Sequence, residues 1–297
     1  MFTKSNFRIL LSLTCLTLMI AIIIGCAAKK SFWGDEKTGF ILNYQLKPDQ
    51  VWNYQINSTE NTNMEQMGQT IDIESNSMIK YTVRGNGLNE QKNLLSTITI
   101  DTINVVAKGM GGERTVDMSP FIGKSFGLTF SPKGDELEFS GVDTIVVDLG
   151  MTQGGKQTPR NSFRTVFPDL PDEPVKIGET WTDKDTTTVN QSGMKIDVTT
   201  DGKHKLEGYE TVDGIECLKI SSKTAGIMDG AGQTMGMDMN FEGDIDGKST
   251  FYFAYKTGTF IKVITESFME GTIAISGPTN MTMPITVESK STINLLK

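Results

Sequence analysis

Apolar and polar residues alternate one by one along most of the chain beyond residue 40. In residues 249–255, the side chains of Phe251, Phe253 and Tyr255 fall on one side of an extended chain. A turn containing Lys-Thr-Gly follows, and residues 260–264 return with the same alternation. Because successive side chains of a strand point to opposite faces, this pattern predicts antiparallel hairpins with one face in contact with water. We therefore predict a mainly β fold.

The same alternation predicts further strands at residues 51–57, 70–74, 79–84, 94–106, 126–130, 136–139 and 285–295. Helix signals are scarce. One short helix is predicted near residues 159–167, where Phe163, Val166 and Phe167 recur at helical spacing and Pro168 ends the run.

Short sequence segments recur in the same order in the two halves of the chain, which indicates an internal repeat. The offset is 124 to 129 residues for three pairs of segments, 46–52 with 175–181, 68–73 with 193–198, and 123–125 with 247–249. We interpret this as two tandem related antiparallel β-sheet repeats, at residues 40–150 and 170–297, joined by a linker with the short helix at 151–169. The repeats would form either a half-barrel-like arrangement or one merged sheet.

The first segment of the chain has the composition of a secretory signal peptide. Lys4 and Arg8 precede an uncharged and almost continuously apolar run at residues 9–24, and small residues follow. The run ends in Ile-Ile-Gly-Cys, which resembles the lipobox of bacterial lipoproteins. That resemblance implies that residues 1–25 are removed and that Cys26 carries the lipid attachment. The alternative is an uncleaved anchor helix.

The residues after Cys26 refine the expected location. The second position of the mature chain, Ala27, is not the aspartate of an inner-membrane retention signal, and no acidic stretch typical of surface export follows. We therefore expect the periplasmic face of an outer membrane, with residues 26–39 as a lipidated tether.

Composition excludes several classes of protein. The net charge of the 297 residues is −8, which argues against a nucleic-acid binder, and an ordinary charged fraction of 22% argues against disorder. One histidine and three cysteines leave too few ligands for most zinc sites. Cleavage would remove Cys15, so the mature chain would keep Cys26 and Cys217, and we expect Cys217 to be a buried apolar residue.

Four features together resemble a known but uncharacterised family. They are the lipobox, an early Leu-Lys-Pro-x-x-x-Trp segment at 46–52, a Pro-x-x-Pro-Val-Lys-x-Gly-Glu-x-Trp segment at 171–181, and a closing Lys-Thr-Gly hairpin at 256–258. The chain resembles outer-membrane lipoproteins of Bacteroidota that are grouped as a domain of unknown function. It is also loosely similar to half-barrel lipoprotein carriers of the localisation-factor type. These resemblances imply an all-strand fold and carry no catalytic residues across.

Short motifs that resemble enzyme sites lack the sequence context that those sites require. The GxSxG pattern around Ser125 lacks the strand–turn–helix context of a nucleophile elbow, because the residues after it read as a strand. The single histidine, His204, lies among lysines. No motif names a cofactor, but strand-borne carboxylates such as Asp183 and Asp185 leave a carboxylate-dependent hydrolase open.

A methionine-rich strand at residues 234–245 is the most suggestive feature. Its apolar face holds Met235, Met237, Met239, Phe241, Gly243 and Ile245, while acidic residues occupy the opposite face. Methionine suits surfaces that accept varied apolar ligands, and thioethers also favour Cu(I). Three interpretations stay open: ordinary packing of a sheet, an apolar ligand site, and a copper site.

The sequence therefore predicts a lipid-anchored, non-enzymatic envelope lipoprotein that faces the periplasm. Its expected ligand is lipid-like or apolar and would bind in a β groove lined by Met235, Met237, Met239 and Phe241. No cofactor and no nucleic acid is expected. The alternatives are a structural or interaction subunit of an envelope complex, and the carboxylate-dependent hydrolase.

Overall fold

The computed structural model describes residues 32–66, 68–148, 156–164, 166–191, 194–234, 237–277 and 280–297. The predicted signal peptide, Cys26 and Met235 lie outside these residues. Among the described residues, no helix is long and apolar enough to cross a membrane.

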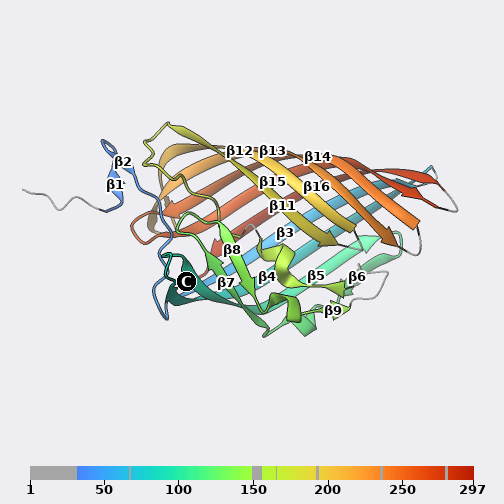
Figure 1. Cartoon of the computed structure of the whole chain (residues 1–297), viewed down its shortest axis with the longest axis horizontal. Helices are drawn as coiled ribbons and strands as arrows, with labels where there is room; N and C mark the ends of the chain where they lie inside the picture. Colours follow the sequence, from blue (N-terminus) through green and yellow to red (C-terminus); the bar gives the residue numbers. More distant parts are fainter. Residues whose placement is uncertain are drawn as a thin grey trace, which may run out of the picture.

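One 12-stranded antiparallel sheet forms most of the molecule, which confirms the predicted fold class (Figure 1). Its strands are β3 (Val51–Gln66), β4 (Gln69–Leu88), β5 (Leu94–Gly109), β6 (Gly112–Val116), β7 (Ser125–Phe130), β8 (Glu136–Ser140), β11 (Thr180–Gln191), β12 (Met194–Val212), β13 (Ile215–Thr234), β14 (Met237–Ala254), β15 (Thr259–Ser276) and β16 (Met281–Leu295). Two small pairs, β1 (Gly34–Asp35) with β2 (Gly39–Phe40) and β9 (Val147–Asp148) with β10 (Lys156–Gln157), lie outside it.

The strand order merges the two predicted repeats into one sheet. The order is β11-β12-β13-β14-β15-β16-β3-β4-β5-β7-β8, with β6 paired to β5. The last strand, β16, pairs with β3, so that Leu295 lies opposite Tyr54. Of the two arrangements that the sequence left open, the chain adopts the single sheet, and β11 and β8 are its two edges.

Strand starts keep the offset of the sequence repeats. β3 and β11 begin at Val51 and Thr180, and β4 and β12 begin at Gln69 and Met194. The first half differs at one place, because β6 and β7 correspond to the single long strand β14. The interruption contains the 3₁₀ helix η2 (Ser119–Phe121). Descent from a duplication stays our interpretation of this correspondence.

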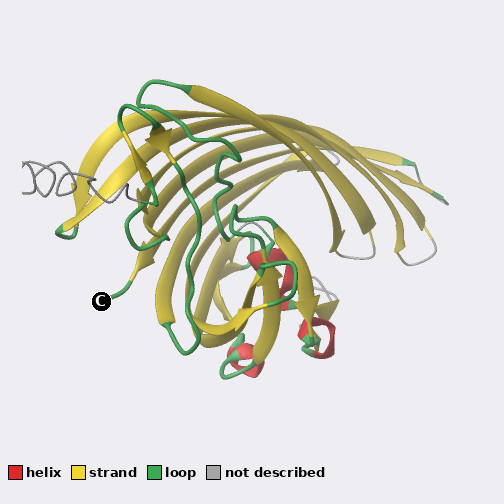
Figure 2. Cartoon of the chain, turned by 60° about the vertical axis from the view of Figure 1, so that its left-hand side comes forward, coloured by secondary structure: helices red, strands yellow, loops and turns green. Residues whose placement is uncertain are grey.

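The sheet arches over the connecting parts of the chain, as Figure 2 shows. We call the covered side the inner face and the other side the outer face. At one end, the inner face packs against residues 40–46 and against the connecting segment, which we define as residues 158–164 and 166–175. The largest fully buried side chains of this core are Tyr54, Tyr81, Phe40, Phe130, Phe163, Phe251, Phe253, Phe260, Leu42, Leu94, Ile98 and Ile100.

The predicted helix at 159–167 is shorter and tighter than expected. Its described part is the 3₁₀ helix η5 (Pro159–Phe163), and the Oγ1 of Thr158 accepts a hydrogen bond from the backbone N–H of Arg160. Phe163, Val166 and Phe167 are nevertheless buried in the core, as their spacing suggested. The apolar spacing therefore predicted the burial of these residues correctly but overestimated the length of the helix.

Residues 32–39 of the predicted tether belong to the folded body. β1 pairs with β2, and the backbone N–H of Ile41 donates to the carbonyl of Trp33. The ring of Trp33 packs edge-on against Tyr255, with 6.4 Å between ring centroids. Residues 32–39, which the sequence assigned to the tether, therefore include a strand pair and an aromatic contact with the body of the fold.

Cys217 is buried, as predicted, and packs with Tyr252, Ala254 and Ile261. Burial raises the pKa of its thiol to about 11. The thiol is therefore protonated and unreactive at neutral pH.

Candidate functional site

Side chains on the inner face change character along the strands. Next to the aromatic core lies a belt of small hydroxyl residues, in which Oγ of Ser58 and Oγ of Ser77 are 2.6 Å apart. The register continues this belt through Ser291, Thr265 and Ser249 on neighbouring strands. The belt separates the core from the far end of the sheet, where the inner face is apolar again.

We call this far region the distal apolar surface. Cross-strand register places Met194, Ile196, Val198, Met228, Met239, Phe241, Ile245, Met269, Ile273, Ile275, Ile285 and Val287 on it. Most of these side chains are only half-buried. Apolar groups that cover the inside of a sheet and still contact water have a favourable free energy of transfer to any apolar partner.

The described members of the predicted methionine face lie on this surface or, in the case of Met237, next to it on the same face of β14. Met237 and Met239 are half-buried and Phe241 is 5% exposed, while Asp238 and Glu242 project from the outer face and are exposed. The predicted alternation of apolar and acidic faces is therefore confirmed for the described residues. Whether the face binds a ligand stays a prediction, and Met235 lies outside the described residues.

Glycines explain why Phe241 is buried on an otherwise open surface. Gly243 and Gly271 are cross-strand partners. A Cβ on Gly243 would lie 3.0 Å from Cζ of Phe241, and a Cβ on Gly271 would lie 3.0 Å from its Cε2. The ring therefore lies flat across two positions that have no side chain, which leaves the surface shallow there.

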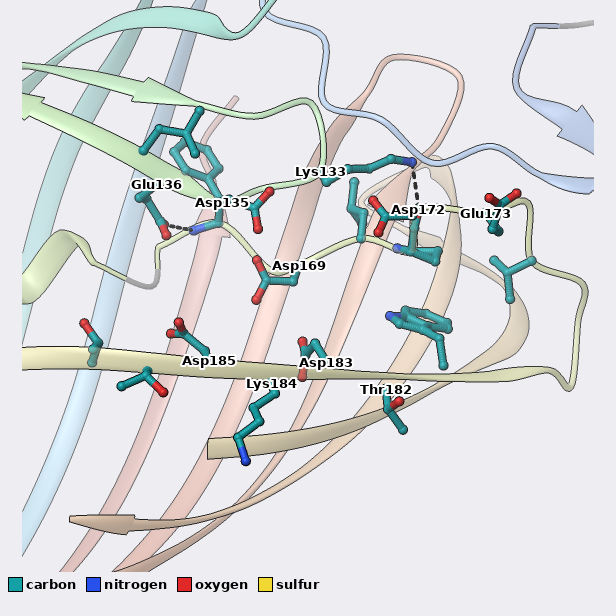
Figure 3. A pocket seen from close by; sticks show the side chains of 18 of the residues that line it. Lys133, Asp135, Glu136, Asp169, Asp172, Glu173, Thr182, Asp183, Lys184 and Asp185 are labelled. Atoms are coloured by element: carbon teal, nitrogen blue, oxygen red, sulfur yellow. Dashed lines mark hydrogen bonds between the residues drawn. The ribbon is translucent and has the colours of Figure 1, made fainter. Parts of the chain in front are cut away.

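A second region of interest is a cavity of about 1210 Å³ between the two edges of the sheet, which we call the seam cavity. It is lined by β8 and the turn before it, by the connecting segment, and by the first part of β11. Figure 3 shows that Asp183 and Asp185 point from β11 toward Asp169, whereas Lys184 points to the opposite side of the strand. Acidic residues outnumber basic ones in its lining.

The connecting segment links the two edges across this seam. Oε1 of Glu136 on β8 accepts hydrogen bonds from the backbone N–H groups of Val166 and Phe167, at 3.1 and 3.2 Å. On the other side, Nη1 of Arg164 donates to Oγ1 of Thr187 on β11 at 2.7 Å. The seam is thus held by polar contacts in addition to the aromatic core beneath it.

Three adjacent strands place a hydrogen-bonded chain beside the cavity. Nε2 of His204 is 2.9 Å from Oδ2 of Asp183, and Nδ1 of His204 is 2.7 Å from Oγ of Ser222. The His204 ring lies 5.2 Å from the Trp181 indole at an interplanar angle of 19°. His204 and Ser222 are buried, which leaves Ser222 no access to a substrate. Trp181 and Asp183 line the cavity and are held in place by this chain.

The cavity shifts the ionisation of its carboxyl groups in opposite directions. Burial, and then the carboxylate of Asp183, raise the pKa of Asp169 to about 7. The hydrogen bond from His204 lowers the pKa of Asp183. Burial raises the pKa of Glu136 to about 9, although the backbone N–H groups it accepts from oppose this shift. At neutral pH the cavity therefore holds both protonated and ionised carboxyl groups.

The structure keeps Ser125 of the GxSxG pattern away from His204, but it brings together Asp183 and Asp185, the two carboxylates that left a hydrolase open. Ser125 begins β7 and its Oγ lies 2.8 Å from Oγ1 of Thr99, far along the strand order from His204 on β12. Asp183 and Asp185 both line the seam cavity. Carboxyl groups with pKa values pushed apart are an arrangement that acid–base catalysis uses. Among the described residues, no group of three His, Cys, Asp or Glu side chains could hold a metal ion.

Sequence reasoning did not find the partners of Asp183 and Asp185. Asp169 comes from the connecting segment, and Glu136 and Trp181 come from the two edges of the sheet. No shared motif or spacing connects the three residues. The only signal in the sequence was the density of acidic residues in 169–185.

No family model and no curated protein matches the chain. Among solved structures, it is similar to lipovitellin, from a structure of "lipid-protein interactions in lipovitellin", with a TM-score of 0.50 and 10% identity. The match covers 85% of this chain and 26% of the lipovitellin chain, so the chain corresponds to a minor part of that protein. At this identity the likeness concerns the fold alone.

Two bacterial structures give weaker likenesses. OccK2 of Pseudomonas aeruginosa matches at a TM-score of 0.30 and 8% identity, over 85% of this chain and 100% of that one. A mutant porin of Rh. blastica matches at a TM-score of 0.19 and 9% identity, over 83% and 100%. A TM-score below 0.5 does not establish a shared fold, and nothing about this chain follows from these two.

Proposed function

We propose that this protein is a lipid-anchored envelope lipoprotein, without catalytic activity, that binds a lipid-like amphiphile on its inner face. The observation that carries the proposal is the distal apolar surface, a set of half-buried aliphatic and methionine side chains on the covered side of an arched sheet. Methionine adapts its shape to different apolar partners, and Met194, Met228, Met239 and Met269 are spread over four strands of that surface.

The neighbouring hydroxyl belt fits an amphiphile better than a purely apolar ligand. An acyl chain on the distal apolar surface would place a polar group beside Ser77, Thr265 and Ser291, whose hydroxyl groups can donate or accept hydrogen bonds. The fold likeness to lipovitellin, whose structure is described in terms of lipid–protein interactions, agrees with this ligand class.

The anchor and the location are part of the same proposal. The lipobox ending at Cys26 supports acylation, and the residues that follow support the periplasmic face of an outer membrane. Membership of the uncharacterised Bacteroidota lipoproteins is likewise proposed on the quoted motifs.

The test is the lipid that co-purifies with the protein. The full chain is purified from its own membranes in detergent, extracted with organic solvent, and the extract is quantified by mass spectrometry. Covalent acyl chains stay on the protein and are measured separately. We expect stoichiometric lipid in the wild-type extract and a loss of about tenfold in Met239→Gln, which introduces an amide into the apolar surface.

The matched control is Ile227→Gln on the outer face of β13, where the Ile227 side chain is 54% exposed. This variant should retain the wild-type amount of lipid. Absence of lipid from the wild-type protein, or equal loss in both variants, would contradict binding at the distal apolar surface.

A further inference from the structure

The seam cavity is chemically different from the distal apolar surface and has its own ligand preference. It lies between the sheet edges, and its lining combines three aromatic side chains and two guanidinium groups with a larger number of carboxyl groups. Its polar, acidic lining suits a different ligand chemistry from the apolar side chains of the distal apolar surface.

An aromatic platform is held rigidly at the cavity wall. One face of the Trp181 indole packs on the buried His204 ring, and Trp181 also lines the cavity. Because His204 is fixed between Ser222 and Asp183, the orientation of the indole and of the Asp183 carboxylate is set before any ligand arrives. Preorganised groups bind with a smaller loss of conformational entropy.

The carboxylates beside this platform have spare hydrogen-bonding capacity. Among the described residues, no lysine or arginine forms an ion pair with Asp169, Asp183 or Asp185. The two lysines that line the cavity have other partners: Nζ of Lys133 donates to the carbonyls of Leu42 and Pro171, and Lys184 pairs with Asp201 on the outer face.

The cavity also offers a donor. Arg164 lines it and donates from Nη1 to Thr187, while its buried Nε has no hydrogen-bond partner within the described part of the chain. A ligand that both donates to carboxylates and accepts from a guanidinium group matches the polar groups that line the cavity.

We propose that the seam cavity binds a neutral carbohydrate, with a sugar ring stacked on Trp181 and its hydroxyl groups donating to Asp169 and Asp183. Sugar rings present a flat C–H face that packs on an indole and a rim of hydroxyls that donate strongly to carboxylates. The net negative lining repels phosphate and carboxylate ligands, which excludes anionic lipid head groups from this site. The volume of about 1210 Å³ exceeds that of typical small-molecule sites, so it accommodates more than one sugar ring.

The experiment measures binding of three neutral hexasaccharides, maltohexaose, cellohexaose and chitohexaose, to the full chain in a detergent without a sugar head group. Isothermal titration should detect saturable binding of at least one of them, and the same sugar should quench tryptophan fluorescence. Asp183→Asn and Trp181→Ala should each weaken that binding about tenfold or more. Asp244→Asn, which removes the same charge from the exposed outer face of β14, should leave it unchanged.

Melting temperatures of the variants separate lost binding from lost folding. If Trp181→Ala fails to fold, Trp181→Phe, which keeps an aromatic ring, and Asp169→Asn carry the comparison. Failure of all three hexasaccharides to bind the wild-type protein overturns the proposal. Saturable binding of the cationic probe spermidine in their place, or an equal effect of Asp244→Asn, also overturns it.

Discussion

Glu136 illustrates how one residue acquires its properties from distant parts of the chain. It lies at the start of β8 in an alternating segment that resembles many exposed strands. Its carboxyl group is nevertheless enclosed by the connecting segment and accepts two backbone N–H groups. The pKa of about 9 follows from this burial.

The raised pKa predicts a defined pH dependence of stability. In the unfolded chain the Glu136 carboxyl ionises near 4.5, and in the folded chain near 9, so the unfolded state binds fewer protons between these values. The contribution of Glu136 to stability is therefore present below about pH 4.5 and is lost as pH rises toward 9. The Glu136→Gln side chain can still accept both hydrogen bonds and does not ionise. At pH 8 the free energy of unfolding of this variant should therefore be on the order of 2 kcal/mol higher than that of the wild-type protein.

Urea unfolding of both proteins from pH 5 to pH 9 checks this prediction. The difference in the free energy of unfolding should grow with pH. Glu138→Gln, on the same strand and exposed, provides the control and should follow the wild-type profile. A constant difference between Glu136→Gln and wild type across this range would disprove the assignment.

At the scale of the element, β14 combines three environments within one strand. Its last residues, including Phe251 and Phe253, are part of the aromatic core, and Ser249 belongs to the hydroxyl belt. Phe241 belongs to the distal apolar surface, and Gly243 lies next to it on the same face of the strand. The backbone of β14 is one continuous strand, but its side chains vary in size. Where the strand has a glycine, a neighbouring side chain can lie close against the sheet.

Two glycines of β14 should differ sharply in their tolerance of a side chain. A Cβ on Gly243 would lie 2.8 Å from the carbonyl oxygen of Glu270 and close to the Phe241 ring, whereas a Cβ on Gly247 would have no neighbour nearer than 3.7 Å. Gly243→Ala should therefore lower the free energy of unfolding by about 1–3 kcal/mol through overpacking. Gly247→Ala should be neutral or slightly stabilising, since alanine reduces the entropy of the unfolded chain.

Thermal and urea denaturation of the two variants, compared under the same conditions, measure this contrast. Both positions lie on the inner face of one strand, so the general effect of replacing a strand glycine is shared. Equal destabilisation by the two substitutions would refute the close approach at Gly243.

At the scale of the whole molecule, the chain forms one open sheet whose ends meet its own connecting segment. The pairing of β16 with β3 joins the two halves, and the segment between them fills the seam between β8 and β11. Edge strands otherwise present free backbone groups to other chains. The connecting segment covers part of both edges and creates the seam cavity at the same time.

The anchor is the prediction that concerns the molecule in its membrane. Labelled palmitate should be incorporated into the wild-type protein and should be absent from Cys26→Ala, because the thiol is the acceptor of the lipid in a lipobox protein. Autoradiography of the immunoprecipitated protein, labelled with radioactive palmitate, measures the incorporation. Persistent label in Cys26→Ala would refute lipidation at this residue.

Features that depend on residues close together in the sequence could be predicted better than features that depend on residues far apart in it. Alternation correctly predicted the strands near Val51 and Leu94, and it correctly assigned Met239 and Glu242 to opposite faces. It placed the ends of strands less well: the separate strands predicted at 70–74 and 79–84 are parts of the single strand β4. Burial of Cys217 was also predicted, from the general tendency of free cysteine to be buried.

The sequence by itself determined the strand-rich fold, the two-sided strands, the repeat spacing and the expected anchor, because each depends on neighbours along the chain. Only the tertiary structure decided that β16 pairs with β3, that Asp169 lies near Asp183 in a cavity, and that the connecting segment covers the Glu136 carboxyl group. These features depend on strand order and sheet curvature, which bring together residues from distant parts of the sequence. Local periodicity contains no information about such long-range contacts.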